Sequence, residues 1–260
     1  MNKKEFLKIF NGSQFISGIH NYCDRWCERC SYSEKCSVYT MDTKVQKGKS
    51  SEEEKEAVKN SMEKTNESLL IALEMFEEIA KESGIDLEAL RINEEAEKQK
   101  ELEAIEHPIA INSKKYSYMA YEWTQKNAAL FYKFGEELLE KENLGIYKKQ
   151  DTINLLEINE ALSIIQWDYH QIHIKLMRAL KNREVNWEFE DEIQNDANGS
   201  AKVALISVER SLKSWETLLE LFNERENEVL EILAVLDRTR KDILKEFPKV
   251  RQFVRPGFDE

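Results

Sequence analysis

Four cysteines near the start of the chain have the clearest potential for chemistry. Cys23, Cys27, Cys30 and Cys36 are the only cysteines among the 260 residues, and their spacing is C-x3-C-x2-C-x5-C. Positions i, i+4 and i+7 share one face of an α-helix, so the first three would point the same way and Cys36 would return from the following loop. Four convergent thiolates are the ligands of tetrahedral zinc and of cubane iron–sulfur clusters. The spacing therefore predicts a metal centre.

Disulfides and redox or catalytic thiols are the competing interpretations. Disulfides need an oxidising compartment, but the first ten residues lack the apolar run of a secretory signal. No later stretch reaches the roughly 18 apolar residues of a membrane span. We therefore expect a cytoplasmic, reducing location and no membrane, which favours a metal over disulfides.

The identity of the metal is less strongly indicated. Zinc knuckles commonly place Gly or Pro beside a C-x2-C pair, and neither residue occurs there. This favours an iron–sulfur cluster, of the 4Fe–4S type, with Zn as the alternative. His20 stands three residues before Cys23 and is a possible substitute ligand, although it would equally serve as a half-buried helix residue.

Three resemblances bear on the cysteines. The segment from Cys27 to Cys36 resembles the C-x2-C-x5-C end of the cluster in RecB-like and CRISPR-associated iron–sulfur nucleases, whose nuclease strands have no counterpart here. Cys23, Cys27 and Cys30 resemble the C-x3-C-x2-C of radical SAM enzymes, but Arg29 stands where that family has an aromatic residue. The blocks 20–30 and 196–215 resemble a bacterial all-helical family with an N-terminal four-cysteine cluster, which implies no activity.

The elements that must position the cysteines are predicted to be helices. Eight glycines, three prolines and 34% charged residues are typical of long helices with short connections. Apolar residues recur at spacings of three and four in 69–80, 116–138, 158–176, 205–222 and 229–247, and Ser200 stands where an N-cap would open a helix over 201–224. We expect an all-α bundle of five or six long helices with a short N-terminal cysteine-bearing helix and loop.

The charge distribution divides the chain into a small basic and a large acidic part. Residues 1–50 carry nine Lys or Arg against five Asp or Glu, whereas the remainder has a net charge of −16. The composition changes across residues 41–60, so we expect a cysteine segment at 1–45 and a helical bundle at 52–250, together forming one compact domain. The acidic body disfavours nucleic acid as a partner.

Two groups of polar residues within the expected bundle are further candidates. His170 and His173 share a helix face, with Glu157, Glu160 and Asp168 on the same helix, yet no Glu-x-x-His pair of a di-iron site occurs. Hydrogen bonding inside the bundle explains these residues equally well. Lys175 and Arg178 could line an anionic pocket, or pair with nearby carboxylates.

The segment from Asp196 to Lys202, Asp-Ala-Asn-Gly-Ser-Ala-Lys, combines a sharp turn with a helix start. Backbone N–H groups there could receive a phosphate or carboxylate, with Lys202 adding positive charge. The alternative is a simple turn with a serine cap. The glycine position does not match an EF-hand loop.

No pattern in the sequence specifies a reaction. The first hypothesis is a metalloprotein whose four-cysteine site is structural or redox-sensing and whose bundle binds a protein partner or a small ligand. The second is an iron–sulfur oxidoreductase that acts on a substrate in the bundle. The third is a zinc-stabilised interaction module without catalysis.

Overall fold

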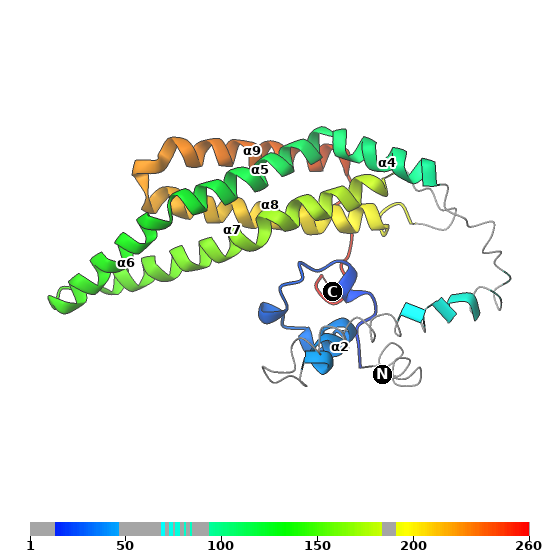
Figure 1. Cartoon of the computed structure of the whole chain (residues 1–260), viewed down its shortest axis with the longest axis horizontal. Coiled ribbons are helices and arrows are strands. Elements are labelled where there is room, and N and C mark those ends of the chain that lie inside the picture. Colours follow the sequence, from blue (N-terminus) through cyan, green and yellow to red (C-terminus); the bar gives the residue numbers. More distant parts are fainter. Residues whose placement is uncertain are drawn as a thin grey trace. The chain divides into compact units, whose positions relative to one another are not determined.

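The computed structural model describes residues 14–46, 94–183 and 191–259, together with scattered positions between 69 and 84. Every regular element in these residues is an α-helix or a 3₁₀ turn, and none of them forms a strand. The all-helical prediction is therefore confirmed (Figure 1). The chain divides into two compact units: residues 1–98 with 256–260, and residues 99–255.

Four long helices form the packed body of the second unit. They are α5 (Pro108–Lys126), α7 (Lys149–Lys181), α8 (Asp196–Leu221) and α9 (Glu226–Glu246). In space α7 packs on α8 and α5, and α9 closes the arrangement by packing on α8 and α5. The apolar residues that recur at three and four in the sequence lie on the facing sides, which explains why these helices form a bundle.

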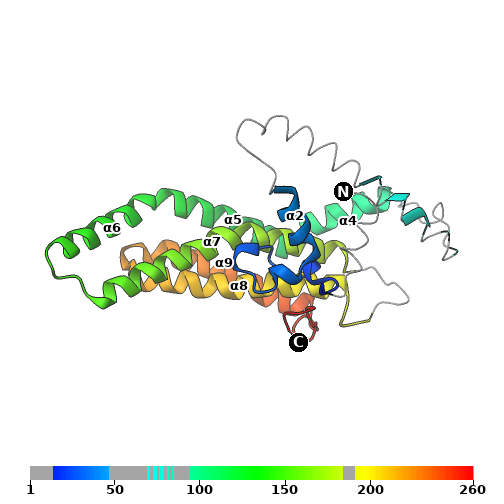
Figure 2. The ribbon, with the colours of Figure 1, turned by 90° about the horizontal axis from the view of Figure 1, so that it is seen from below.

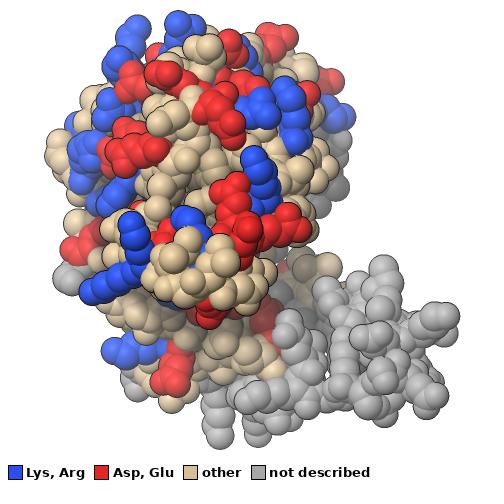
Figure 3. Space-filling model, turned by 90° about the vertical axis from the view of Figure 1, so that its left-hand side faces the viewer, with Lys and Arg blue, Asp and Glu red and all other residues tan. Residues whose placement is uncertain are grey.

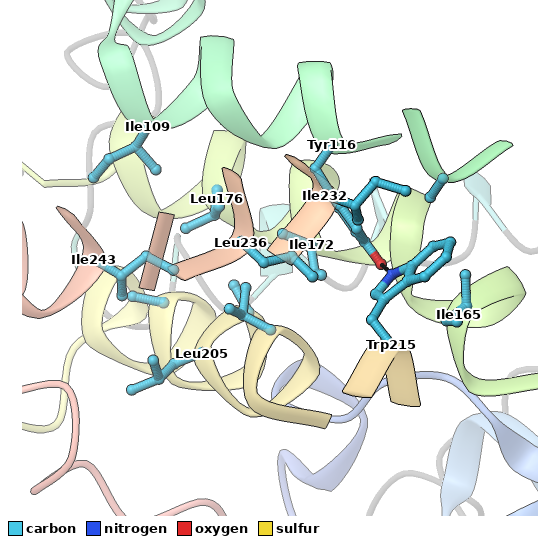
Figure 4. Packing of buried hydrophobic residues seen from close by; sticks show 14 of the residues in the cluster. Ile109, Tyr116, Ile165, Ile172, Leu176, Leu205, Trp215, Ile232, Leu236 and Ile243 are labelled. Carbon is cyan, nitrogen blue, oxygen red and sulfur yellow. Dashed lines mark hydrogen bonds between the residues drawn. The ribbon is translucent and has the colours of Figure 1, made fainter. Parts of the chain in front are cut away.

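Buried aromatic residues join the helices in the bundle core. Trp215 of α8 and Tyr116 of α5 are fully buried, and the indole Nε1–H donates to the tyrosine oxygen at 3.2 Å (Figure 4). Trp123 packs edge-on against Trp215, with ring centroids 5.0 Å apart. The hydrogen bond satisfies the one polar group of the buried indole.

The expected helical run over 116–138 is two helices. α5 ends at Lys126 and α6 (Ala128–Asn143) follows, because the Asn127 side-chain amide donates to the Trp123 carbonyl at 3.0 Å and competes with the helical pattern. Phe131 and Phe134 of α6 pack against Phe222. Beyond these contacts, α6 and the first part of α7 extend past the ends of α8 and α9 (Figure 2).

Several helix ends lie where Pro and Gly residues in the sequence predict them. Pro108 occupies the first turn of α5, and Gly145, with φ +69°, follows the end of α6. The N-cap predicted at Ser200 is wrong: α8 begins at Asp196, and Asn195 caps it by accepting from the Asn198 N–H at 2.8 Å. Ser200 is buried inside the helix.

The apolar positions expected at 69–80 differ from the others. Leu69, Leu73 and Phe76 are helical but exposed, whereas Ala80 lies outside the described residues. Most of the expected linker at 41–60 also lies outside them. The first six residues of that range are helical and end α2 (Ser37–Gln46), which directly follows the last cysteine.

Candidate metal centre

The cysteines lie on tight turns. The structure does not form the α-helix that we expected across Cys23 to Cys30; it has three 3₁₀ turns, η1 (Ile19–Asn21), η2 (Cys27–Arg29) and η3 (Ser33–Lys35). Asp24 explains the break, because its Oδ1 accepts from the Trp26 N–H at 3.1 Å and forms a local turn. Arg25 in this turn has φ +60°, a left-handed conformation that is rare for a residue with a side chain.

Backbone hydrogen bonds fix the chain at Cys30 and Cys36, the last two of the four cysteines. Cys30 N–H donates to the Cys27 carbonyl at 3.2 Å, and Cys36 N–H donates to the Ser33 carbonyl at 3.2 Å. The Cys36 carbonyl in turn accepts from Thr40 N–H at 3.1 Å and from Thr40 Oγ1 at 3.0 Å, at the start of α2. Each of these cysteines therefore stands at the end of a closed turn.

All four cysteines line one cavity. They are half-buried thiols around a volume of about 20 Å³, room for roughly one water-sized sphere. Ile19, Trp26, Tyr39 and Phe258 form apolar and aromatic parts of the wall, and His20 also lines it. The turns thus bring together residues that an α-helix was expected to align.

The thiols are close enough to influence one another. Burial raises the pKa of the Cys27 thiol, and the charges of Cys23, Cys36 and Cys30 raise it further. A metal cation among them would have the opposite effect, because it stabilises thiolates. Four thiolates so close together repel one another, and a cation or a cationic cluster core among them would offset that repulsion.

The thiols nevertheless do not converge as they would around a single ion. In the part of the chain that the structure describes, no three Cys, His, Asp or Glu side chains are placed to hold one metal ion. The Cys23 thiol instead points to the His20 carbonyl at 3.5 Å. The four cysteines share a cavity but are not placed to hold one metal ion together.

Aromatic residues surround the cysteine turns. The Arg29 guanidinium lies 4.0 Å from the centre of the Trp26 ring, a cation–π contact. Tyr32 and Phe258 pack edge-on with ring centroids 5.3 Å apart. Sequence reasoning missed Phe258 as part of the cavity, because nothing in the sequence links the C-terminus with the cysteines. It also missed Tyr39, which stands only three positions after Cys36.

The two histidines of α7 each face a serine of α5. His173 Nδ1 lies 2.9 Å from Ser113 Oγ, and His170 Nδ1 lies 3.3 Å from Ser117 Oγ. Ser113 also donates to the Ala110 carbonyl at 2.9 Å and is fully buried, so its hydroxyl is not accessible to a substrate. Burial lowers the pKa of His173, and Lys114 and His170 lower it further. These pairs are hydrogen bonds between packed helices.

The charged residues singled out in α7 and α8 pair within the bundle. Arg178 Nε donates to Asp196 Oδ2 at 2.9 Å and thereby joins the end of α7 to the start of α8. Lys202 donates to the backbone carbonyls of Phe253 and Arg251 and not toward the helix start, where it could have added charge for an anion. Lys175 is buried. The interpretation as structural ion pairs therefore holds for Arg178.

A polar cavity of about 740 Å³ lies at the end of the bundle where α8 begins and α9 ends. Glu246 accepts a hydrogen bond from Arg183 Nη1 at 3.4 Å, and its carboxylate lies 3.7 Å from His107 Nε2. Lys249 pairs with Glu192. Burial lowers the pKa of His107; Glu246 opposes this shift and Arg183 adds to it. Sequence reasoning missed this cavity, whose lining comes from distant segments of the chain.

Comparison of the chain with models of known families, with characterised proteins and with solved structures finds no match. The resemblance to a bacterial helical family with four N-terminal cysteines stays a prediction. Among the described helices, none combines the length and the apolar composition needed to cross a membrane.

Proposed function

We propose that this chain is a helical metalloprotein in which Cys23, Cys27, Cys30 and Cys36 hold an iron–sulfur cluster or zinc. The observation that carries this proposal is the single cavity lined by all four cysteines of the chain. Its metal has a structural or redox-sensing role, and the bundle of long helices binds a protein partner or a small ligand. The proposed location is the cytoplasm, where thiols stay reduced.

A 4Fe–4S cluster is the favoured occupant. Around one zinc ion, Zn–S bonds of about 2.3 Å place neighbouring sulfurs roughly 3.8 Å apart. A cubane stands between its four thiolates and holds them farther apart. The lack of Gly or Pro beside Cys27 and Cys30 favours the cluster over zinc. The small cavity must then widen, which the short turns allow more readily than a continuous helix would.

A structural role follows from the small core around the cysteines. Among residues 14–43, whose side chains the structure describes, Ile19 is the only hydrophobic side chain that is fully buried. So few buried apolar groups give little folding free energy, and small segments of this kind are commonly stabilised by a metal. The free energy of metal binding is then also folding free energy.

Two surfaces of the bundle support the binding role. The polar cavity around Glu246 offers charges of both signs to a small polar ligand. The α6–α7 hairpin exposes large apolar residues, which favour a protein partner; they are Tyr132, Leu139, Leu144, Ile146 and Leu156. Positive and negative side chains are interspersed on the face seen in Figure 3, which supports a partner other than nucleic acid.

The two alternative functions require different features of the molecule. An iron–sulfur oxidoreductase needs a substrate site, and neither cavity described above is lined by His170, His173, Lys175 or Arg178. A zinc-stabilised interaction module needs only the apolar surface of the hairpin. A brown protein with broad visible absorption would exclude the zinc module.

Chelation followed by limited proteolysis tests the structural role. After metal removal, we expect new cleavage within residues 14–46, while the fragment containing α5 to α9 stays resistant and helical. Restoring the metal should remove the new cleavage, which serves as the control. An identical cleavage pattern with and without metal would contradict a structural role.

A further inference from the structure

The C-terminal residues pack against the turns that carry the cysteines. Phe258 lines the cysteine cavity and lies edge-on against Tyr32, at an interplanar angle of 80°. Pro256 approaches Gly18 at the start of η1: a Cβ added to Gly18 would lie 4.0 Å from Pro256 Cγ. Residues 256–260 belong to the same compact unit as the cysteines.

The contact at Gly257 is the closest of these. Gly257 has φ +75°, and a Cβ built there would lie 2.9 Å from Ile16 Cδ1 and 3.2 Å from Ile19 Cδ1. Both the backbone conformation and the space therefore require glycine. Because Ile19 also lines the cavity, Gly257 lets the chain pass close enough for the Phe258 ring to reach it.

We propose that residues 256–258 are a cover over the cysteine cavity that controls the exchange of its metal and the access of oxidants. This inference rests on the proposed function. An apolar shell around a metal site limits the entry of water, chelators and oxidants, and thiol reactivity increases with exposure. Phe258 is a positioning and shielding residue and supplies no ligand.

The residues just before this cover are held in place within the bundle unit. Gln194 makes two hydrogen bonds with Val254, since its Nε2 donates to the Val254 carbonyl at 3.0 Å and its Oε1 accepts from the Val254 N–H at 2.7 Å. Lys202 donates to the Phe253 carbonyl.

The test compares Phe258→Ala and Gly257→Ala with the wild-type chain loaded with its metal. We expect a chelator to remove the metal about tenfold faster from both variants, since changes around metal ligands typically alter affinity 10–100-fold. Val254→Ala is the matched control, because it shortens an exposed apolar side chain of the same segment that does not line the cavity. Its rate should equal that of the wild type.

The outcomes separate this proposal from the proposed function. Metal binding with equal release rates in all four proteins would overturn the cover and leave the metal centre intact. If the natively purified chain holds no metal, the metal centre is wrong, and the rate at which a thiol reagent modifies the cysteines then tests the cover. Severalfold faster modification in Phe258→Ala would support the cover, and equal rates would overturn it.

Discussion

Arg210 of α8 holds the carboxylate of Asp168 in α7 with two hydrogen bonds. Its Nε donates to Oδ2 at 2.8 Å and its Nη2 donates to Oδ1 at 2.5 Å. The Asp168 side chain is 0% exposed and the Arg210 side chain 27% exposed. A carboxylate buried to this extent depends on its partner, because an unpaired buried charge is costly. This pair therefore links the two helices that make the largest contact in the bundle.

Replacement of Arg210 by Met should destabilise the bundle. The variant leaves the Asp168 carboxylate without its guanidinium, and the loss of one partner of a buried pair costs about 3 kcal/mol. Urea unfolding monitored by circular dichroism measures the free energy of unfolding. Lys213→Met, at an exposed position of the same helix, is the control and should change it by less than about 0.5 kcal/mol. Equal stabilities of the two variants would refute the importance of the pair.

Tyr116→Phe tests the hydrogen bond in the aromatic core. The variant keeps the ring but leaves the Trp215 indole N–H, which is fully buried, without its acceptor at 3.2 Å. An unsatisfied buried donor costs about 1–3 kcal/mol, and the free energy of unfolding should fall by that amount. Tyr132→Phe removes an exposed hydroxyl and is the control. A free energy of unfolding equal to that of the wild type would mean that another acceptor reaches the Trp215 indole in Tyr116→Phe.

His173 should make the bundle less stable at mildly acidic pH. Burial lowers the pKa of His173 below its ordinary value of 6.5. As the pH falls through 6.5, the unfolded chain therefore binds a proton that the folded chain resists, and the free energy of unfolding decreases until the folded-state pKa is passed. His173→Gln removes the titratable imidazole. The free energy of unfolding of this variant should therefore fall less than that of the wild type between neutral and mildly acidic pH.

Denaturant midpoints at two pH values measure this difference. Gln166, an exposed residue of the same helix without a titratable side chain, provides the control variant Gln166→Ala, whose stability should follow the wild type with pH. Parallel pH profiles of His173→Gln and the wild type would show that folding leaves the pKa of His173 unchanged and would contradict this prediction.

Local patterns predicted the bundle well because the relevant signals are local. Leu205, Val208 and Trp215 recur on one helix face and are buried, as their spacing indicates. The break at Asn127 was missed, since one side-chain amide that bonds back to Trp123 outweighs an otherwise continuous pattern. The apolar spacing of Leu69, Leu73 and Phe76 indicated a helix but not its exposure.

The spacing identified four candidate metal ligands, which stay a prediction, and it did not anticipate the backbone that carries them. Spacing alone indicated that Cys23, Cys27 and Cys30 face one point, and they line one cavity, yet the path between them is made of 3₁₀ turns. The turn at Asp24 and the left-handed Arg25 redirect the chain in a way that helical periodicity does not express. Phe258 could not be found from the sequence, because its contact with the cavity joins opposite ends of the chain.

Metal analysis of the anaerobically purified chain tests the central claim most directly. Iron, sulfide and zinc are measured per chain in the wild type, in Cys30→Ser, and in Ser31→Ala, an exposed neighbour that leaves all four thiols in place. We predict about four irons with sulfide in the wild type and in Ser31→Ala, as in a cubane, and a clear loss in Cys30→Ser. One zinc per chain would support the metal centre and would show that it holds zinc and not an iron–sulfur cluster. Absence of bound metal from the wild type, or the same metal content in Cys30→Ser, would contradict the account.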